Sequence, residues 1–325
     1  MELSPLDRKI LYYLDQNSRQ SLSHLAKKLK KGRNVILYRI NQLKERAIIK
    51  NSFAEINNSL LGYYNFRLLF KIENSTDEEI LRLSNFIKKQ KGITFFSKVL
   101  GKWDFDLVFT SKKIIDFEKF RETLFIKFNK IINDSEISVQ KEIYYYPKDF
   151  LIKEKKSKIE YTLVGLKESL DYQCDEKDEQ ILTELSKDAS LNLISLSTKT
   201  KLSINTLKKR IKNLEKKKII LGYRLFIDPT KFGYEYYKLH IKLKDYQKDD
   251  LLNFRGWIGK KVSLVYIDHY INGADFEIEL IFEKEGEYIS FLDELNKEFG
   301  KIIKEKYLLK FYDLETFAYL PQKRR

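Results

Sequence analysis

LSHLAKKLKKGRNVILYRINQLKERAII, residues 22–49, decides the fold of this 325-residue chain. Apolar residues recur at helical spacing over residues 22–29 and again over residues 33–46, where Ile36, Ile40 and Leu43 form one face. The short turn Lys30-Lys31-Gly32 separates the two runs. Two helices joined by such a turn are typical of a helix-turn-helix, which places its second helix in the major groove of DNA.

The same pattern occurs a second time, 171 residues farther along the chain. LISLSTKTKLSINTLKKRIKNLEKKKII, residues 193–220, aligns with the first stretch without a gap, and matches continue from near the N-terminus to near the end. Matched pairs include Asp7 with Asp178, Ile40 with Ile211, Gly62 with Gly233, Asp104 with Asp275 and Phe120 with Phe291. The chain is therefore predicted to contain two copies of one unit, diverged enough to differ in role.

The first ~55 residues of each copy predict three helices and a hairpin. Ser4 is a good N-cap for the first helix, with Pro5 at the first helical position. Ser21 and Asn192 cap the second helices. The third helices are expected at Arg33–Arg46 and Ile204–Lys217.

The remainder of each copy alternates polar and apolar residues with period two, which indicates strands. In the first copy, strands near 93–100, 102–110 and 136–146 and a helix near 115–131 complete a βαββαβ order, the ferredoxin-like arrangement. The predicted fold class is α+β: two tandem copies of a winged helix-turn-helix plus a βαββαβ regulatory and dimerisation domain. The predicted segments are 1–60, 61–147, a linker at 148–173 with a short strand at 161–164, 174–230 and 231–325.

Polar residues line one side of these predicted strands. Arg67 and His240 lie opposite the apolar positions, where we expect solvent. Alternating carboxylates are likewise expected on the wet face of a sheet rather than as an acid–base pair; they are Asp104, Asp106, Asp275, Glu277 and Glu279.

Basic side chains concentrate on the paired helices. The chain carries 62 Lys and Arg against 47 Asp and Glu, a net charge of +15, which favours a polyanionic partner. Residues 27–46 hold eight basic residues and one acid, and residues 199–218 hold nine and one. The side chains expected to face DNA are Arg33, Asn34, Tyr38, Arg39, Asn41, Asn205, Thr206, Lys208, Lys209, Arg210 and Lys212. A solvated basic helix without a partner would carry the same charge.

These residues resemble the Lrp/AsnC (feast/famine) family of transcription regulators. The resemblance covers nearly the whole chain, twice. In the first copy it lies in Leu6-Asp7-Arg8-Lys9-Ile10-Leu11, Leu25-Ala26-Lys27, Arg39-Ile40-Asn41-Gln42-Leu43 and Leu61-Gly62-Tyr63. In the second it lies in Arg210-Ile211-Lys212-Asn213-Leu214, Ile219-Ile220-Leu221-Gly222-Tyr223 and Phe232-Gly233-Tyr234. One departure is Lys31, at a turn position where the family and Leu202 are apolar.

The resemblance implies the partners. They are double-stranded DNA, a small effector such as an amino acid, and self-association through the α+β domains, which pair with each other or with a second chain. The family's effector loop has a Gly-x-x-Asp pattern, and the effector candidates are Gly101, Trp103, Asp104, Gly273 and Asp275. Gly101-Lys102-Trp103-Asp104 fits that pattern, whereas in the second copy Asn272 replaces the first glycine. A plain hairpin turn at Gly101 would explain the same residues.

Two alternative functions stay open at this point. A DNA-coating protein of low sequence preference would use the same lysines. Siroheme decarboxylases resemble the same two-domain arrangement and come as paired halves with a His- and Arg-rich signature in the α+β domain. Asp268-His269-Tyr270-Ile271-Asn272 is the nearest match here, and it lacks the accompanying Arg and further His.

Residues for other chemistry are sparse. The single cysteine, Cys174, and three histidines, His24, His240 and His269, show no metal-ligand spacing. We therefore expect no metal, no cofactor and no enzymatic activity. Met1–Ile10 does not read as a signal peptide, and no apolar run approaches the ~20 residues of a membrane helix, so a cytoplasmic location is expected.

Overall fold

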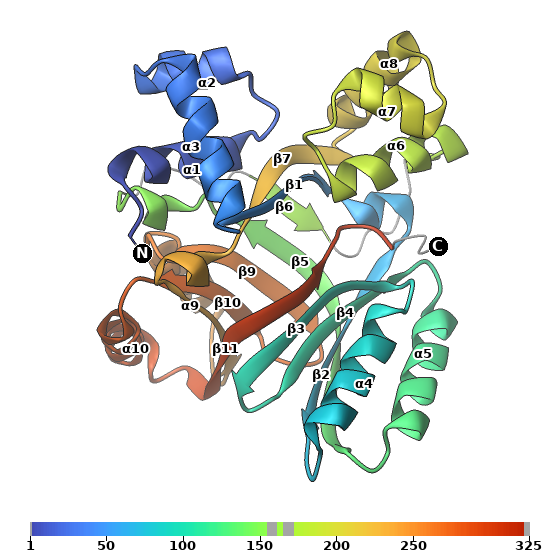
Figure 1. The fold of residues 1–325 in the computed structure, drawn as a ribbon. Coiled ribbons are helices and arrows are strands. Elements are labelled where there is room, and N and C mark those ends of the chain that lie inside the picture. Colours follow the sequence, from blue (N-terminus) through green and yellow to red (C-terminus); the bar gives the residue numbers. More distant parts are fainter. Residues whose placement is uncertain (1, 155–160, 165–171, 322–325) are drawn as a thin grey trace.

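Both sets of three helices form where the sequence predicts them. The computed structural model describes residues 2–154, 161–164 and 172–321 (Figure 1). The first module comprises α1 (Pro5–Gln16), α2 (Leu22–Leu29) and α3 (Arg33–Glu45). The second comprises α6 (Glu176–Lys187), α7 (Leu193–Thr200) and α8 (Ile204–Lys216). Polar side chains cap five of these helices by accepting a backbone N–H, namely Ser4, Ser21, Asp175, Asn192 and Ser203.

The βαββαβ order is confirmed in both copies. The first runs β2 (Tyr64–Ile72), α4 (Asp77–Lys88), β3 (Ile93–Gly101), β4 (Phe105–Ser111), α5 (Ile114–Lys127) and β5 (Ile132–Tyr145). The second runs β8 (Glu235–Leu243), α9 (Lys248–Ile258), β9 (Leu264–Ile271), β10 (Phe276–Phe282), α10 (Glu285–Phe299) and β11 (Ile303–Phe317). The strand orders are β5-β2-β4-β3 and β11-β8-β10-β9, as in a ferredoxin-like sheet.

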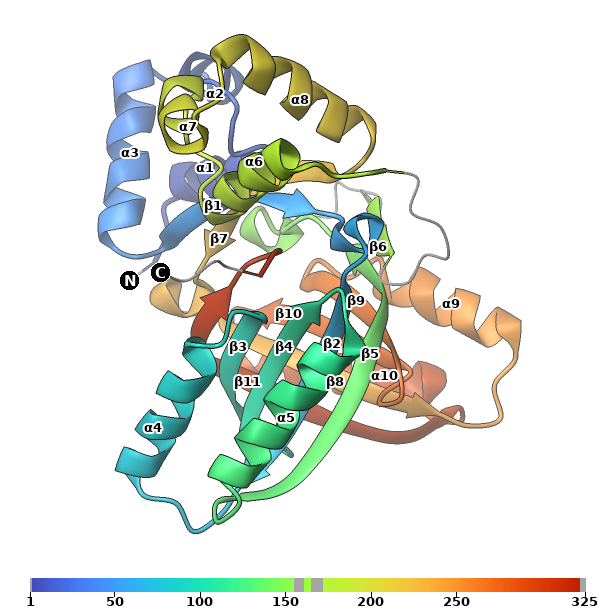
Figure 2. The same ribbon diagram turned by 90° about the vertical axis from the view of Figure 1, so that its right-hand side faces the viewer.

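The two sheets join edge to edge into a closed antiparallel ring (Figure 2). The strands β5 and β11 are long enough to serve both sheets. The first part of β5 pairs with β2 and its second part with β9, while β11 pairs first with β8 and then with β3. Helices α4 and α5 cover the outside of one half and α9 and α10 the other. The pairing expected between the two α+β domains therefore occurs within one chain.

The polar strand face turns into this ring, so the expectation of a solvated face is wrong. Arg67 is 3% exposed and His240 1%. Asp106, Glu277 and Glu279 are buried as well. The apolar face of each strand already packs against its own helices, and the opposite face is covered by the other copy's sheet. The alternation of polar and apolar residues identified the polar face of each strand. It could not show that the other copy's sheet covers that face.

The expected hairpin within each module is also wrong. A single strand follows each third helix, β1 (Ile49–Ile56) after α3 and β7 (Ile220–Ile227) after α8. These two strands pair antiparallel with each other, with Phe53 opposite Arg224. The β1/β7 ribbon crosses above the ring and joins the two modules (Figure 1).

Each module is seated on the strand of the other copy. α1 packs on β7, where Leu225 and Ile227 join the first module's core, and α6 packs on β1, where Ala54 and Ile56 join the second's. Matching backbone hydrogen bonds hold both modules on these strands. Ser18 N–H donates to the Tyr223 carbonyl at 2.9 Å, and Ala189 N–H donates to the Ser52 carbonyl at 2.9 Å.

The predicted linker contains one described strand. β6 (Tyr161–Val164) is the short strand that the sequence suggested, and it pairs with β5; residues 155–160 and 165–171 lie outside the described residues. The predicted segment limits stay predictions. Among the described residues, no helix combines the length and apolar character needed to cross a bilayer.

Candidate nucleic-acid interface and chamber

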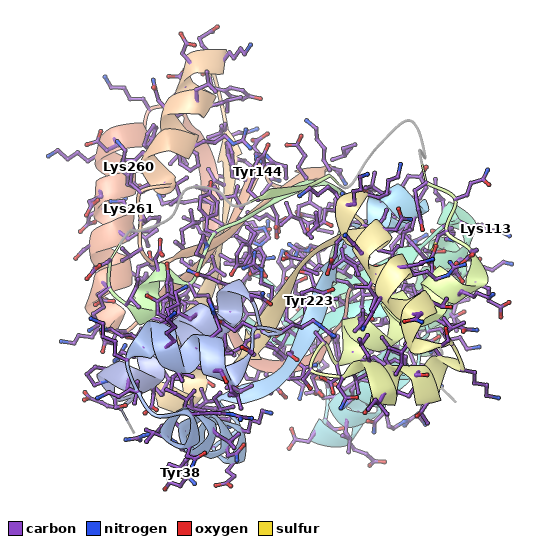
Figure 3. All side chains as sticks on the ribbon, turned by 90° about the horizontal axis from the view of Figure 1, so that it is seen from above. Tyr38, Lys113, Tyr144, Tyr223, Lys260 and Lys261 are labelled. Carbon is purple, nitrogen blue, oxygen red and sulfur yellow. The ribbon has the colours of Figure 1, made fainter. Side chains whose placement is uncertain are left out.

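Helix α3 has one buried and one exposed face. Its apolar residues Ile36, Ile40 and Leu43 are buried against the module, whereas its predicted DNA-facing side chains Arg33, Asn34, Tyr38 and Asn41 are exposed. Tyr38 is 60% exposed and points away from the body of the protein (Figure 3). The exposed face therefore combines a guanidinium, two amides and an aromatic ring, all groups that contact bases or phosphates.

Helix α8 presents a different set of groups. Asn205, Lys208, Lys209 and Lys212 are exposed. Thr206 is half-buried, with its hydroxyl 2.9 Å from that of the N-cap Ser203. The face is richer in ammonium groups than that of α3 and has no exposed aromatic ring at the position of Tyr38. The two helices are thus not interchangeable.

Arg39 and Arg210, both predicted to face DNA, occupy matching ion pairs inside the modules. The guanidinium of Arg39 lies 3.6 Å from the buried Asp7 carboxylate. That of Arg210 lies 2.8 Å from both Asp175 and Asp178. Each pair ties the third helix to the start of the first, which points to a positioning role. Helical spacing could not predict these contacts, because the partner acids lie on or at the start of another helix.

The effector candidates occupy hairpin turns with structural roles. Gly101 has φ +140°, and a Cβ there would lie 2.3 Å from the Leu308 carbonyl oxygen. Asp104 accepts a hydrogen bond from the backbone of Ile72 at 2.8 Å, and Asp275 accepts the matching bond from Leu243 at 2.7 Å. Trp103 is buried, and Gly273 has φ +120°. None of the five lines the chamber described next.

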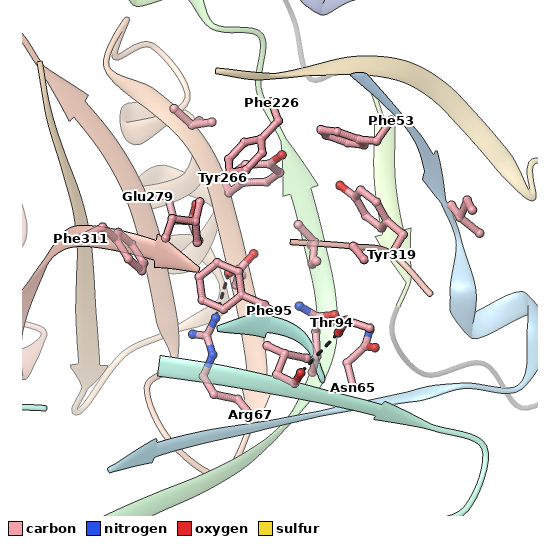
Figure 4. A pocket seen from close by; sticks show the side chains of 18 of the residues that line it. Phe53, Asn65, Arg67, Thr94, Phe95, Phe226, Tyr266, Glu279, Phe311 and Tyr319 are labelled. Atoms are coloured by element: carbon pink, nitrogen blue, oxygen red, sulfur yellow. Dashed lines mark hydrogen bonds and ion pairs between the residues drawn. The ribbon is translucent and has the colours of Figure 1, made fainter. Parts of the chain in front are cut away.

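A chamber of about 160 Å³, partly open to solvent, lies between the β1/β7 ribbon and the inside of the ring (Figure 4). Its walls combine aliphatic and neutral polar side chains with several aromatic rings, which include Phe53, Phe95, Phe226, Tyr266, Phe311 and Tyr319. Four charged residues also line it: Arg67, Lys148, Asp268 and Glu279. One sequence signal points to this site: charged residues recur on the inward strand face of both copies, and Arg67 is matched by Lys238.

Two buried charge networks border the chamber. On the ribbon side, Glu55 lies 3.2 Å from Arg224, and Asp15 lies 2.7 Å from Lys148. Burial raises the pKa of Glu55 to about 6, although Arg224 opposes the shift. This network contains equal numbers of acids and bases.

The network inside the ring contains more acids than bases. Arg67 lies 3.2 Å from Asp106 and also contacts Glu277, while Lys238 lies 2.7 Å from Glu279 and 3.3 Å from Asp268. Burial raises the pKa of Asp268 to about 6, and the adjacent Lys238 opposes that shift. Near neutral pH this carboxyl group is therefore largely ionised, at an electrostatic cost.

Comparison with known proteins agrees with the presence of two helix-turn-helix modules. A family model described as winged helix-turn-helix DNA-binding matches residues 3–50 and 175–220. An uncharacterised HTH-type transcriptional regulator of Pyrococcus furiosus is 31% identical over 121 residues, which is 37% of this chain and 80% of that protein. LrpA of Pyrococcus abyssi, also an HTH-type transcriptional regulator, is 31% identical over 128 residues, 39% of this chain and 87% of its own length. The chain belongs to the Lrp/AsnC family of transcriptional regulators.

Each of these relatives corresponds to about one copy of the repeat, so this Lrp/AsnC chain contains two family units. Over its full length the fold is similar to a solved siroheme decarboxylase, NirDL, with TM-score 0.62 and 12% identity, covering 99% of this chain and 95% of that one. At that identity the likeness concerns the fold alone. It places the whole Lrp/AsnC chain, both modules and the closed ring, in an arrangement already seen in a solved structure.

Proposed function

We propose that this protein is a sequence-specific DNA-binding transcription regulator that reads an asymmetric site with α3 and α8. The observation that carries the proposal is the seating of two capped helix-turn-helix modules, each with a basic exposed face, on one shared ribbon. In a homodimer two identical modules read a palindrome. Here Arg33 and Asn34 in one module and Asn205 and Thr206 in the other would read different half-sites.

The test is a salt titration of binding to the DNA upstream of the protein's own gene, beside a scrambled fragment of equal length. Arg33→Ala and Asn205→Ala are expected to weaken binding to the native fragment by about 1–3 kcal/mol and to leave the scrambled fragment nearly unaffected. Lys208→Ala and Lys209→Ala are expected to weaken both fragments equally and to lower the salt slope by about one each.

Lys260→Ala is the matched control. It removes the same charge from an exposed residue after α9, away from both modules, and is expected to change neither fragment (Figure 3). If all four helix variants behave alike, the assignment of base-reading residues fails. Equal affinities for the two fragments that collapse together as salt rises would point instead to a DNA-coating protein.

A second candidate, a siroheme-decarboxylase-like enzyme, is favoured by the full-length fold match. His269, from the segment that most resembles that family's signature, is half-buried between Tyr144 and Phe276 and lies 3.0 Å from the Asp275 carbonyl. Burial lowers its pKa to about 4, and it does not line the chamber. The regulator without catalysis is therefore our proposal, and absence of DNA binding even at low salt would bring the enzyme forward.

The remaining expectations belong to the same proposal. A small effector such as an amino acid would act by changing the spacing of the modules, and further self-association would use the outer surfaces of the α+β domains. The cytoplasm is the compartment in which such a regulator meets DNA. Gel filtration with and without DNA tests the assembly.

A further inference from the structure

The chamber under the β1/β7 ribbon has the size and the lining of a binding site for a small ring. Its volume is about 160 Å³, and an apolar protein cavity of about 150 Å³ is large enough to take up benzene. Aromatic side chains approach from both copies, with Phe53 and Phe95 from the first and Phe226 and Phe311 from the second. Such walls favour a flat apolar body and also attract a cation.

The charge network inside the ring favours a positive ligand, although the charged residues that line the chamber itself, Arg67, Lys148, Asp268 and Glu279, are balanced. Inside the ring, the described buried residues include two cations, Arg67 and Lys238, and four carboxylates, Asp106, Asp268, Glu277 and Glu279. Lys238 contacts both Asp268 and Glu279, Arg67 lies 3.9 Å from Asp268, and the Tyr236 hydroxyl donates to Glu279, so two cations still serve four carboxylates. Uncompensated buried negative charge is costly, and a bound cation would relieve it.

The surplus of buried carboxylates over cations comes from the second copy alone. At matching positions, Arg67 corresponds to Lys238 and Asp106 to Glu277, so these two pairs keep their charges and cancel. Asp268 and Glu279 correspond to Ser97 and Val108, which are uncharged. Divergence between the copies has thus placed two carboxylates at one side of the chamber, at positions where the first copy has a serine and a valine.

We propose that the chamber binds a small primary amine with an aromatic body. The ammonium group takes up the position beside Glu279 and Asp268, and the ring lies among Phe53, Phe226 and Tyr266. This site is separate from the hairpin turns at Gly101 and Gly273, and its ligand carries no carboxylate. Because β1 and β7 form its roof and continue directly from α3 and α8, the ligand contacts the strands that carry both modules.

The test uses the full chain without DNA, so its outcome is separate from that of the DNA-binding experiment. Titration calorimetry and thermal shift near pH 8 compare 2-phenylethylamine, 2-phenylethanol, phenylacetate and phenylalanine, which share one ring and differ in charge. The amine is expected to bind at least tenfold more tightly than the alcohol, and phenylacetate should show no binding. Phenylalanine should fall below the amine because it adds a carboxylate to a site already rich in acid.

Glu279→Gln keeps the shape of the side chain and removes one charge. It is expected to reduce the amine's affinity to that of the alcohol while the alcohol still binds, which shows that the variant is folded. Glu294→Gln, on an exposed acid of α10, is the matched control and should leave both affinities unchanged. Val108→Phe narrows the chamber and should weaken every probe.

Three results would overturn the proposal: equal affinities of amine and alcohol, tighter binding of phenylacetate or phenylalanine than of the amine, or no binding of any probe to the unmodified chain. An unchanged amine affinity in Glu279→Gln would also overturn it.

Discussion

At the scale of single residues, burial changes the chemistry of Asp268. Its pKa in the folded protein, about 6, lies above its ordinary value of 3.8. The folded state therefore holds the proton more tightly than the unfolded state, and ionisation of Asp268 costs stability above pH 6. That cost is relieved as the pH falls through 6 towards 4.

Asp268→Asn is expected to remove this cost. Relative to the unmodified protein, the variant should gain stability at pH 8 compared with pH 5, by about 1.4 kcal/mol, because part of the cost is already present at pH 5. Urea unfolding at the two pH values measures the difference, and the other titrating groups cancel in the comparison. A stability difference that is the same at both pH values would contradict the assignment.

Individual residues also mark where sequence reasoning reaches its limit. The exposed positions of α3 and α8 followed from the apolar spacing of Ile36, Ile40 and Leu43, because helical geometry fixes which side chains share a face. The ion pairs of Arg39 and Arg210 did not follow, since they depend on how α3 and α8 pack on the first helices. The periodicity of apolar residues shows which side chains share a face of one helix, but it does not show which helices pack together.

At the scale of elements, the shared ribbon means that a substitution in one copy acts on the other copy's module. Leu225 lies in β7 but belongs to the core of α1 and α3. Leu225→Ala is expected to cost about 2–4 kcal/mol, as buried leucine truncations do. Hydrogen exchange should show the loss of protection in α1, not in α6, even though α6 and Leu225 come from the same copy.

Leu185→Ala provides the comparison. Leu185 is buried in α6 among the second module's core, so its loss should reduce protection in α6 and leave α1 nearly unchanged. If both variants loosen the same module, the crossed seating of the modules on β1 and β7 is wrong.

The elements themselves were predictable, whereas their pairing was not. Local patterns predicted the βαββαβ order of each copy because caps, apolar spacing and alternation are local properties. The partner of β1 was missed because a strand edge looks the same whether it pairs with a neighbouring strand or with a distant one. The same ambiguity hid the closure of the ring through β3/β11 and β5/β9.

At the scale of the whole molecule, the charges inside the ring predict how the two halves behave apart. A pair of first halves, residues 1–154, would bring together two Arg67 and two Asp106, which cancel. A pair of second halves, residues 172–325, would double Asp268 and Glu279 without adding other cations to the network. We expect the first half to form a soluble homodimer near pH 8 and the second half to fold only when the first half is present.

Size exclusion with light scattering and circular dichroism would check this. Mixing the two halves should give a one-to-one complex with the spectrum of the intact chain. A stable, folded dimer of the second half alone near pH 8 would show that its buried acids are compensated in another way.

Glu279 of the second copy stands at the position that Val108 occupies in the first copy. Such a difference is possible only because the two units are joined in one chain. In a symmetric dimer, every side chain near the rotation axis faces its own twin, and any new carboxylate arrives in duplicate. Joining the two units in one chain lifts that requirement, because each side of the axis is encoded separately. An interior that carries an extra pair of carboxylates on one side only is an arrangement that two identical subunits cannot make.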